Sequence, residues 1–286
     1  MQLKNIGKWK IFALESGFFR LDGGAMMGSV PKVLWEKTNP PDSLNRISLA
    51  LRCLLAVYGK NVILIETGMG AKYSEKFKKM FDIDCDKYTL SNALSKHDYK
   101  LSDITHTILT HLHFDHSGGA LYLDDSGVLR PTFPNSKYYV SKRNWEIGMN
   151  PSPRDQASYL KENYLVLKEK GILELVPDNS TILEGISTYC VEGHTTGQQL
   201  IKIADGGQTI IFCSDLIPLK SHLQLPWIMG YDLNAALTLA EKKEFLEKAS
   251  SKNWLLFLYH DPNVIAVRIK KGDKYYEVVD EYKREE

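Results

Sequence analysis

Side chains that bind metal ions are concentrated in residues 110–119, which read Thr-His-Leu-His-Phe-Asp-His-Ser-Gly-Gly. The segment follows a strand-like run and places four candidate ligands within six residues: His111, His113, Asp115 and His116. Imidazole nitrogens and carboxylate oxygens are the ligands that zinc and similar metals prefer. Because the whole chain contains only eight histidines, this density predicts a metal site rather than an ordinary polar loop.

Three more ligand-type residues each follow a strand-like run further along the chain. His194 lies in Gly-His-Thr-Thr-Gly, Asp215 ends Cys-Ser-Asp, and His260 precedes Asp-Pro. A rigid sheet positions the loops at its strand ends, which is why such loops carry function. A lone histidine is more often structural than a ligand, but the repetition of this pattern after the first cluster favours ligands.

The candidates suffice for two ions, because a catalytic zinc needs about three protein ligands and an open position. They divide into two sets: His111, His113 and His194 for one ion, and Asp115, His116 and His260 for the other. Asp215 has two carboxylate oxygens and would bridge the ions. We expect two divalent ions, zinc in the first place, although manganese, iron and cobalt accept the same ligands.

The order of these motifs resembles the metallo-β-lactamase superfamily of metallohydrolases. The likeness rests on His-x-His-x-Asp-His at 111–116, Gly-His-Thr-x-Gly at 193–197, Ser-Asp at 214–215 and His260, and it covers nearly the whole chain. It implies an α+β fold, an αββα sandwich of two mixed β-sheets with helices on the outer faces. It also implies the two ligand sets given above at one edge of the sheets, with Asp215 bridging.

Within the superfamily the chain is most similar to the quorum-quenching, N-acyl-homoserine-lactonase-like branch. Three segments carry this likeness: 19–32, 134–140 and 226–232. The resemblance implies a small-molecule lactone or ester substrate, with N-acyl-homoserine lactones as the first candidates.

Two positions depart from the family pattern. Some lactonases have a tyrosine three residues after the bridging aspartate, where it contacts the substrate carbonyl, and here that position is Pro218. His222 or Tyr231, in the following loop, would then supply the missing donor. The family's early Asp-Thr-Gly turn begins with Glu66 here, which keeps a carboxylate that can orient a metal-binding histidine.

The expected reaction is attack of a metal-bridging hydroxide on a lactone or ester carbonyl, because bound metals bring the pKa of water toward about 7. Asp115 would accept the proton and pass it to the leaving alkoxide. A phosphodiesterase or other phosphoester hydrolase is the alternative, since the same pair of metals serves in-line displacement. A non-catalytic metal-binding protein is a third hypothesis. It is disfavoured because structural zinc sites are closed by four ligands.

Composition bears on partners and location. The chain has 36 Lys+Arg and 35 Asp+Glu, a net charge of +1 and no long basic run, so we expect no nucleic-acid partner. No apolar run approaches the roughly 20 residues of a membrane span, and the first residues lack the apolar core of a secretion signal. The cysteines form no disulfide framework, with Cys53, Cys190 and Cys213 expected in the core and Cys85 exposed. We expect a cytoplasmic protein, and the oligomeric state, a homodimer included, stays open.

Runs rich in β-branched and aromatic residues predict strands at 11–19, 47–58, 62–65, 104–109, 138–140, 172–176, 187–191, 199–203, 209–212 and 255–259. Helices are predicted at 74–81, 90–94, 143–149, 154–169 and 234–249. We expect a single domain over 1–286, with 130–171 forming either a cap over the site or an external connection, and a frayed tail from Asp280.

Five large apolar residues lie in loop-like contexts: Met26, Met27, Trp35, Trp227 and Met229. Flexible methionine side chains suit a pocket for an acyl chain. Each of the five also suits an ordinary place in the core.

Overall fold

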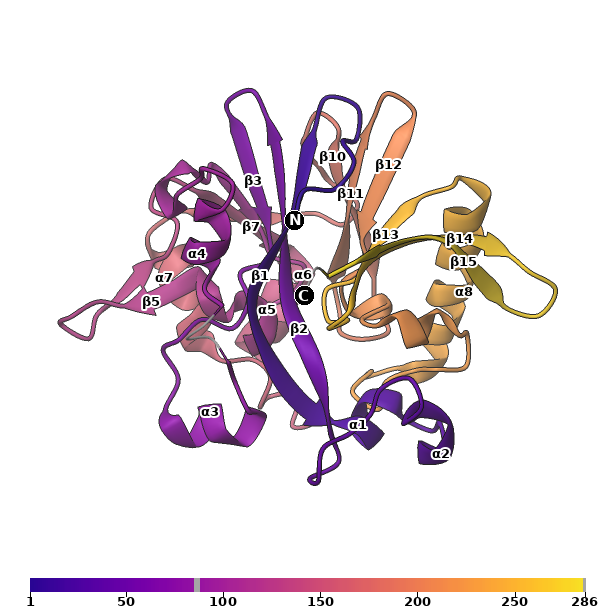
Figure 1. Ribbon diagram of the computed structural model, residues 1–286. Helices are drawn as coiled ribbons and strands as arrows, with labels where there is room; N and C mark the ends of the chain where they lie inside the picture. The colour runs from indigo at the N-terminus through magenta and orange to yellow at the C-terminus, as the bar shows by residue number, and fades with distance from the viewer. Residues whose placement is uncertain (85–87, 285–286) are drawn as a thin grey trace.

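Two β-sheets packed face to face form the centre of the computed structural model, which describes residues 1–84 and 88–284 (Figure 1). The apolar layer between them draws on both sheets, with Leu54 and Ile63 from one and Ile203 and Phe212 from the other. A further apolar layer lies under the helices on each outer face. The expected αββα sandwich is confirmed.

The first sheet has six strands, antiparallel at one side and parallel at the other. Its two long strands pair over most of their length, and the next strand follows through the two-residue turn Gly59-Lys60. Gly59 has a φ of 57°, the left-handed conformation that tight hairpin turns require. In spatial order the strands are β1 (Lys10–Asp22), β2 (Arg46–Tyr58), β3 (Asn61–Ile65), β4 (His106–Ile108), β7 (Lys137–Ser141) and β8 (Leu173–Val176).

The second sheet has seven strands, and only one neighbouring pair, β12 and β13, is parallel. The turn between β11 and β12 uses Gly206 and Gly207, both with positive φ, the conformation that tight hairpin turns require. In spatial order the strands are β15 (Tyr276–Lys283), β14 (Val264–Lys271), β13 (Leu255–Phe257), β12 (Gln208–Phe212), β11 (Gln198–Asp205), β10 (Ile186–Val191) and β9 (Thr181–Leu183).

Helices cover the two outer faces because each buries one apolar side against a sheet. Leu94 of α4 and Leu167 of α7 join the cluster on the first sheet, and Phe245 of α8 joins the cluster on the second (Figure 1). The remaining elements are α1 (Gly23–Met27), α2 (Lys32–Trp35), α3 (Glu75–Phe81), α4 (Leu90–Ser95), α5 (Phe114–Ser117), β5 (Leu121–Leu123), β6 (Leu129–Pro131), α6 (Lys142–Met149), α7 (Leu165–Glu169) and α8 (Ala235–Ser251), with short 3-10 turns at Leu101–Asp103, Gly118–Ala120, Lys161–Asn163, Ser214–Leu216 and Lys220–Leu223.

Two local expectations were wrong. The run 154–169 is not one helix, because it begins as turns and becomes helical only in α7. The Ser158 carbonyl accepts a hydrogen bond from the Phe114 N–H at 2.9 Å. In a continuous helix this carbonyl would instead accept a hydrogen bond from an N–H of the next turn. The tail is not frayed from Asp280 either, since β15 pairs with β14 as far as Lys283.

Other expectations concern burial and membranes. Cys53 and Cys213 are buried and Cys190 is partly buried, whereas Cys85 lies outside the described residues. Within the described ranges, no helix has the length and apolar character needed to cross a membrane.

Candidate metal centre

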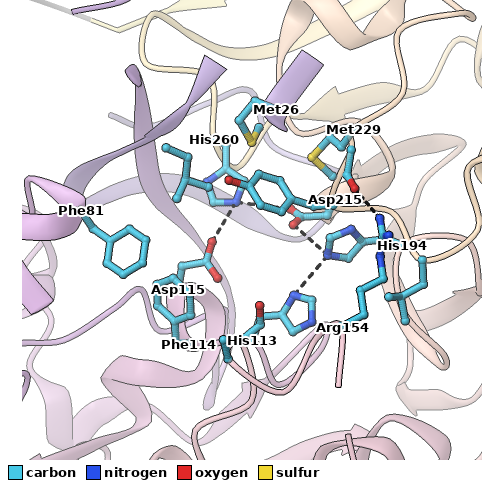
Figure 2. Close-up of a pocket in the computed structure, with 16 residues that line it drawn as sticks. Met26, Phe81, His113, Phe114, Asp115, Arg154, His194, Asp215, Met229 and His260 are labelled. Carbon is cyan, nitrogen blue, oxygen red and sulfur yellow. Dashed lines mark hydrogen bonds and ion pairs between the residues drawn. The ribbon is translucent and has the colours of Figure 1, made fainter. Parts of the chain in front are cut away.

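The structure brings all seven candidate ligands together at one edge of the sandwich, where loops leave the ends of strands in both sheets. The segment after β4 carries His111 and His113 in its loop, and α5 carries Asp115 and His116. The second sheet supplies the rest: His194 between β10 and β11, Asp215 after β12, and His260 after β13. Figure 2 shows the side chains of His113, Asp115, His194, Asp215 and His260 pointing toward one another.

Two glycines permit the close backbone approaches that build this edge. A Cβ on Gly119 would lie 2.1 Å from the Thr67 carbonyl oxygen, and one on Gly193 would lie 2.4 Å from the Thr238 nitrogen. Any larger residue would push α5 away from the turn after β3, or the His194 loop away from α8. The glycines beside the two histidine motifs therefore serve packing.

The first ligand set is a tight triangle of imidazoles. The Nδ1 of His113 lies 3.1 Å from the Nε2 of His111 and 3.2 Å from the Nε2 of His194. One nitrogen from each ring falls within 4.8 Å of the other two, and all three residues are buried. Three converging nitrogens of this kind can hold one ion and leave a position open.

The second set lies beside the first. The Oδ2 of Asp115 is 3.7 Å from the Nε2 of His116 and 3.5 Å from the Nε2 of His260. These three residues likewise offer one atom each within 4.8 Å. The geometry is that of a second, mixed nitrogen and oxygen site.

Asp215 lies between the two sets. Its Oδ2 is 3.3 Å from the Nε2 of His194 and 3.4 Å from the Nε2 of His116, and its Oδ1 is 3.3 Å from the Nε2 of His260. One carboxylate thus reaches ligands of both sets, the position required of a bridge.

Oxygen atoms behind the imidazoles fix their orientation. The Nδ1 of His194 lies 2.9 Å from the Asp232 carboxylate, and the Nδ1 of His260 lies 2.9 Å from the Ala50 carbonyl. Such partners select the tautomer that directs Nε2 into the site. Asp232 was not singled out in the sequence, and its place in the loop before α8 gave no local signal.

The Glu66 carboxylate lies beside the His116 ring, where it can orient that ring. It is fully buried, it accepts a hydrogen bond from the Thr110 N–H at 2.8 Å, and its Oε2 lies 3.6 Å from the Nδ1 of His116. Its φ of 67° is left-handed. The longer side chain therefore still reaches from the turn after β3 to the His116 ring.

Unpartnered atoms test whether the site suits metal ions. The Nε2 of His116 and the Oδ1 of Asp215 are buried and have no hydrogen-bond partner among the described residues. Buried polar atoms without partners are rare, because losing water is costly. Both atoms face the other ligands, so the donor set fits divalent ions.

The pKa values show how strongly this pocket favours positive charge. Burial disfavours the charged form of His116, but Asp215, Asp115 and Glu66 outweigh it and hold its pKa well above the ordinary value. Burial also opposes ionisation of Asp215, yet the neighbouring His116 and His260 hold its pKa well below the usual range. By contrast, burial and then the neighbouring histidines keep the pKa of His111 well below normal, so that ring is neutral and ready to ligate.

A cavity of about 360 Å³ opens over the centre and is lined by five of the seven ligands. Figure 1 shows α1 and α3, which contribute Met26 and Phe81 to its walls, at the same end of the sandwich. Its other lining residues are Leu21, Phe114, Arg154, Ala157, Ser158, Met229, Gly230, Tyr231 and Leu233. The walls are therefore mainly apolar above a polar floor.

The apolar residues singled out in the sequence divide into two groups. Met26 and Met229 line the cavity, whereas Met27, Trp35 and Trp227 do not. Met27 and Trp35 are buried in the layer between the sheets, and Trp227 packs against it.

The two candidate substrate donors have different positions. Tyr231 lines the cavity and is 39% exposed. His222 is buried, does not line the cavity, and has its Nε2 3.0 Å from the Met26 carbonyl. Pro218 does not line the cavity either; its carbonyl accepts the His260 N–H.

The segment 130–171 contributes residues that line the cavity and a residue, Asn144, that joins the two histidine loops. Asn144 accepts the Leu112 N–H at 2.9 Å and donates to the Thr196 carbonyl at 2.9 Å, which joins the two histidine loops. Arg154 lines the cavity with its guanidinium. Neither residue was predicted as functional, because both looked like ordinary helix positions.

A sandwich of this topology with paired histidine and aspartate sets defines a class of metal-dependent hydrolases. The family model of the metallo-beta-lactamase superfamily matches residues 52–260, and the chain belongs to that superfamily. The chain is accordingly a metallohydrolase, and members of the superfamily generally bind divalent metals, as the motif order led us to expect.

Among curated proteins, the chain is 21% identical to a probable metallo-hydrolase of Mycobacterium tuberculosis, over 88% of this chain and 86% of the relative. It is 24% identical to an N-acyl homoserine lactonase of Bacillus cereus, over 81% of this chain and 87% of the relative. The lactonase-like likeness seen in the sequence is thus matched by relatives with that name.

Solved structures agree with the fold over almost the full length. A probable metal-dependent hydrolase from Staphylococcus aureus superposes with a TM-score of 0.90 at 27% identity, covering 99% of both chains. AidC, described as a dizinc quorum-quenching lactonase, superposes with a TM-score of 0.80 at 22% identity, covering 99% of this chain and 97% of the other.

Proposed function

We propose that the protein is a dinuclear hydrolase that opens lactones or cleaves carboxylic esters. The observation that carries this proposal is the pair of three-residue ligand sets, joined by Asp215, on the floor of an apolar-walled cavity. Seven ligands for two ions leave coordination positions for a water molecule and a substrate.

We assign the two sets as the metal ligands: His111, His113 and His194 for one ion, Asp115, His116 and His260 for the other, and Asp215 for both. Two bound divalent ions, zinc in the first place, would supply activated water at neutral pH and polarise a carbonyl oxygen. The nitrogen-rich donor set and the dizinc description of a structural relative support zinc.

Two further side chains have roles in this proposal. Asp115 is the carboxylate placed to hold a proton and deliver it to the leaving alkoxide. Tyr231 would donate a hydrogen bond to the substrate carbonyl, in place of the tyrosine that Pro218 replaces. Burial raises the pKa of Tyr231 to about 12, so its hydroxyl stays protonated and able to donate at neutral pH.

The cavity walls support a substrate with an apolar chain. Phe81, Phe114 and Met26 line the cavity beside the ligands, and aromatic and thioether groups bind alkyl chains through area burial and adaptable packing. The curated relatives named N-acyl homoserine lactonases act on compounds of this kind. We therefore propose N-acyl-homoserine lactones as the first substrates to test.

The test is hydrolysis of N-decanoyl-homoserine lactone beside bis-p-nitrophenyl phosphate, with zinc-loaded wild type, Asp215→Ala and the control Asp273→Ala. Asp273 is an exposed carboxylate in the β14–β15 turn. We expect lactone turnover by wild type and Asp273→Ala. Asp215→Ala should lose at least 100-fold in kcat and bind less than two zinc ions per chain by elemental analysis. Turnover of the phosphodiester alone would reject the lactonase proposal in favour of phosphoester hydrolysis.

A further inference from the structure

One charged side chain of the cavity has no place in the proposed chemistry. Arg154 is the sole lysine or arginine among the described residues that line the cavity. It comes from the turn region after α6. We therefore expect Arg154 to contact the ligand that the cavity binds.

The guanidinium is held in place by backbone rather than by a carboxylate. Its Nη2 donates to the Gly230 carbonyl at 2.7 Å, the contact drawn as a dashed line from Arg154 in Figure 2. The Gly230 N–H in turn donates to the Ala25 carbonyl at 2.8 Å. Arg154 is thus fixed through one nitrogen to a loop that is itself fixed on α1.

The rest of the guanidinium is uncommitted. No ion pair and no other guanidinium hydrogen bond of Arg154 is present within the described part of the chain. The two carboxylates that line the cavity, Asp115 and Asp215, are both turned to the histidines. An arginine offers five N–H donors in a planar fork that suits carboxylates. Arg154 is exposed, so water satisfies its other four donors until a ligand replaces that water.

Four acidic side chains at the site are committed to the histidines. Asp115 and Asp215 lie among the ligands, and Glu66 and Asp232 lie behind His116 and His194, so these four carboxylates would offset the charge of two bound divalent ions. The positive charge of Arg154 is not offset by any carboxylate among the described residues that line the cavity. An anionic ligand would supply that missing charge.

We propose that Arg154 is a specificity residue that binds a second, negatively charged carboxylate on the substrate, away from the bond that is cleaved. This inference rests on the proposed hydrolase function and adds a preference to it: among lactones and esters, those with a free carboxylate bind better than neutral ones. N-acyl-homoserine lactones, which have no free carboxylate, would bind without this contact. The scissile carbonyl would lie over the two ligand sets, and the remote carboxylate would pair with the guanidinium of Arg154.

The kinetic test compares the 4-nitrophenyl monoesters of succinate, glutarate and adipate with 4-nitrophenyl butyrate, which has no charge. Wild type should prefer at least one of the anionic esters in kcat/KM. Arg154→Met should reduce that preference by roughly ten- to 100-fold, since a hydrogen-bonded charge is lost, and Arg154→Lys should reduce it less. Lys161→Met, which removes an exposed positive charge of the same segment, should keep the preference.

A binding measurement keeps this test independent of turnover. Calorimetric titration of zinc-loaded protein with succinate, glutarate, adipate and butyrate should show tighter binding of a dicarboxylate, and Arg154→Met should remove that difference. If wild type hydrolyses none of these esters, the titration still decides the role of Arg154, and the lactone assay described above decides the proposed function. Equal affinities for dicarboxylates and butyrate in wild type, or an unchanged difference in Arg154→Met, would overturn the inference.

Discussion

At the scale of single residues, the surroundings of a side chain decide its role more than its type does. His194 and His222 are both buried, His194 in a loop and His222 in a short 3-10 turn. His194 has a carboxylate, Asp232, behind its ring and other ligands in front. His222 instead faces a backbone carbonyl, and its Nδ1 has no hydrogen-bond partner among the described residues. His194 therefore has the surroundings expected of a metal ligand, whereas His222 is a neutral buried ring.

The burial of His222 predicts a pH-dependent loss of stability. Burial, and then the positive charge of Lys242, lower its pKa to about 3 from 6.5. The unfolded chain therefore takes up a proton below about pH 6.5 that the folded chain refuses until about pH 3. The free energy of unfolding should fall as the pH drops through this window, by roughly 4 to 5 kcal/mol at most.

His222→Gln keeps a donor for the Met26 carbonyl and removes the titration. Urea unfolding of metal-free protein between pH 7 and 4.5 should show a smaller loss of stability in this variant than in wild type. His106→Gln, which removes a partly exposed histidine, serves as the control and should change the slope less. Parallel curves for wild type and His222→Gln would show that His222 titrates normally.

At the scale of elements, the two sheets are joined at the site by backbone and by a buried arginine. The Ala50 N–H of β2 donates to the His260 carbonyl, and the Arg52 N–H donates to the Tyr259 carbonyl. The Arg52 side chain is fully buried and donates to the Leu258, Asp261 and Val264 carbonyls. This arginine therefore fixes the loop that presents His260.

Replacing Arg52 should destabilise the fold and weaken the second metal set. Its Nε lies 2.6 Å from the Glu15 carboxylate, so Arg52→Met would leave three carbonyls and one carboxylate without their partner. We expect a loss of about 3–5 kcal/mol in the free energy of unfolding, measured by urea denaturation, and less zinc retained after dialysis.

Glu15→Gln offers a milder companion that keeps an acceptor for Arg52. It should lose less stability than Arg52→Met and retain both zinc ions. If Arg52→Met unfolds in water, Glu15→Gln still tests the contact. Wild-type stability and zinc content in both variants would contradict a role in holding the His260 loop.

At the scale of the whole molecule, the candidate centre connects the two halves of the sandwich. The first sheet supplies the ligands at 111–116, and the second supplies His194, Asp215 and His260. Ions held there would cross-link loops that are far apart in the sequence. Ligand binding to the folded state alone stabilises it by mass action.

Metal removal should therefore lower the melting temperature. Zinc at 100 times its dissociation constant adds about 2.7 kcal/mol, which corresponds to roughly 5–10 °C in a chain of this size. Scanning calorimetry of zinc-loaded and dipicolinate-treated protein measures this shift, and added zinc should restore it. Asp215→Ala should show a smaller shift. Equal melting temperatures, with zinc shown to be absent after chelation, would rule out a stabilising cross-link.

Much of the architecture was predictable from local patterns. Runs of β-branched and aromatic residues predicted the strands around the site. The family motifs predicted the sandwich, which the apolar layers and the superposition on solved structures confirm. The close spacing of His111, His113, Asp115 and His116 was enough to indicate where a metal centre would lie. Strand β14 and the edge strand β15 were missed. The charged residues of β15 resemble a solvated tail, and nothing in the local pattern shows that β14 pairs with it.

The amino-acid sequence by itself determined which types of candidate ligand are present, their order along the chain and the strand ends that they follow. Which groups converge is a property of the tertiary structure. The packing places Tyr231 in the cavity and His222 outside it, and it brings Asp232 behind His194 and Arg154 into the wall. Sequence periodicity reports backbone conformation over a few residues, whereas these contacts join residues tens of positions apart, so they depend on how the two sheets and their loops pack.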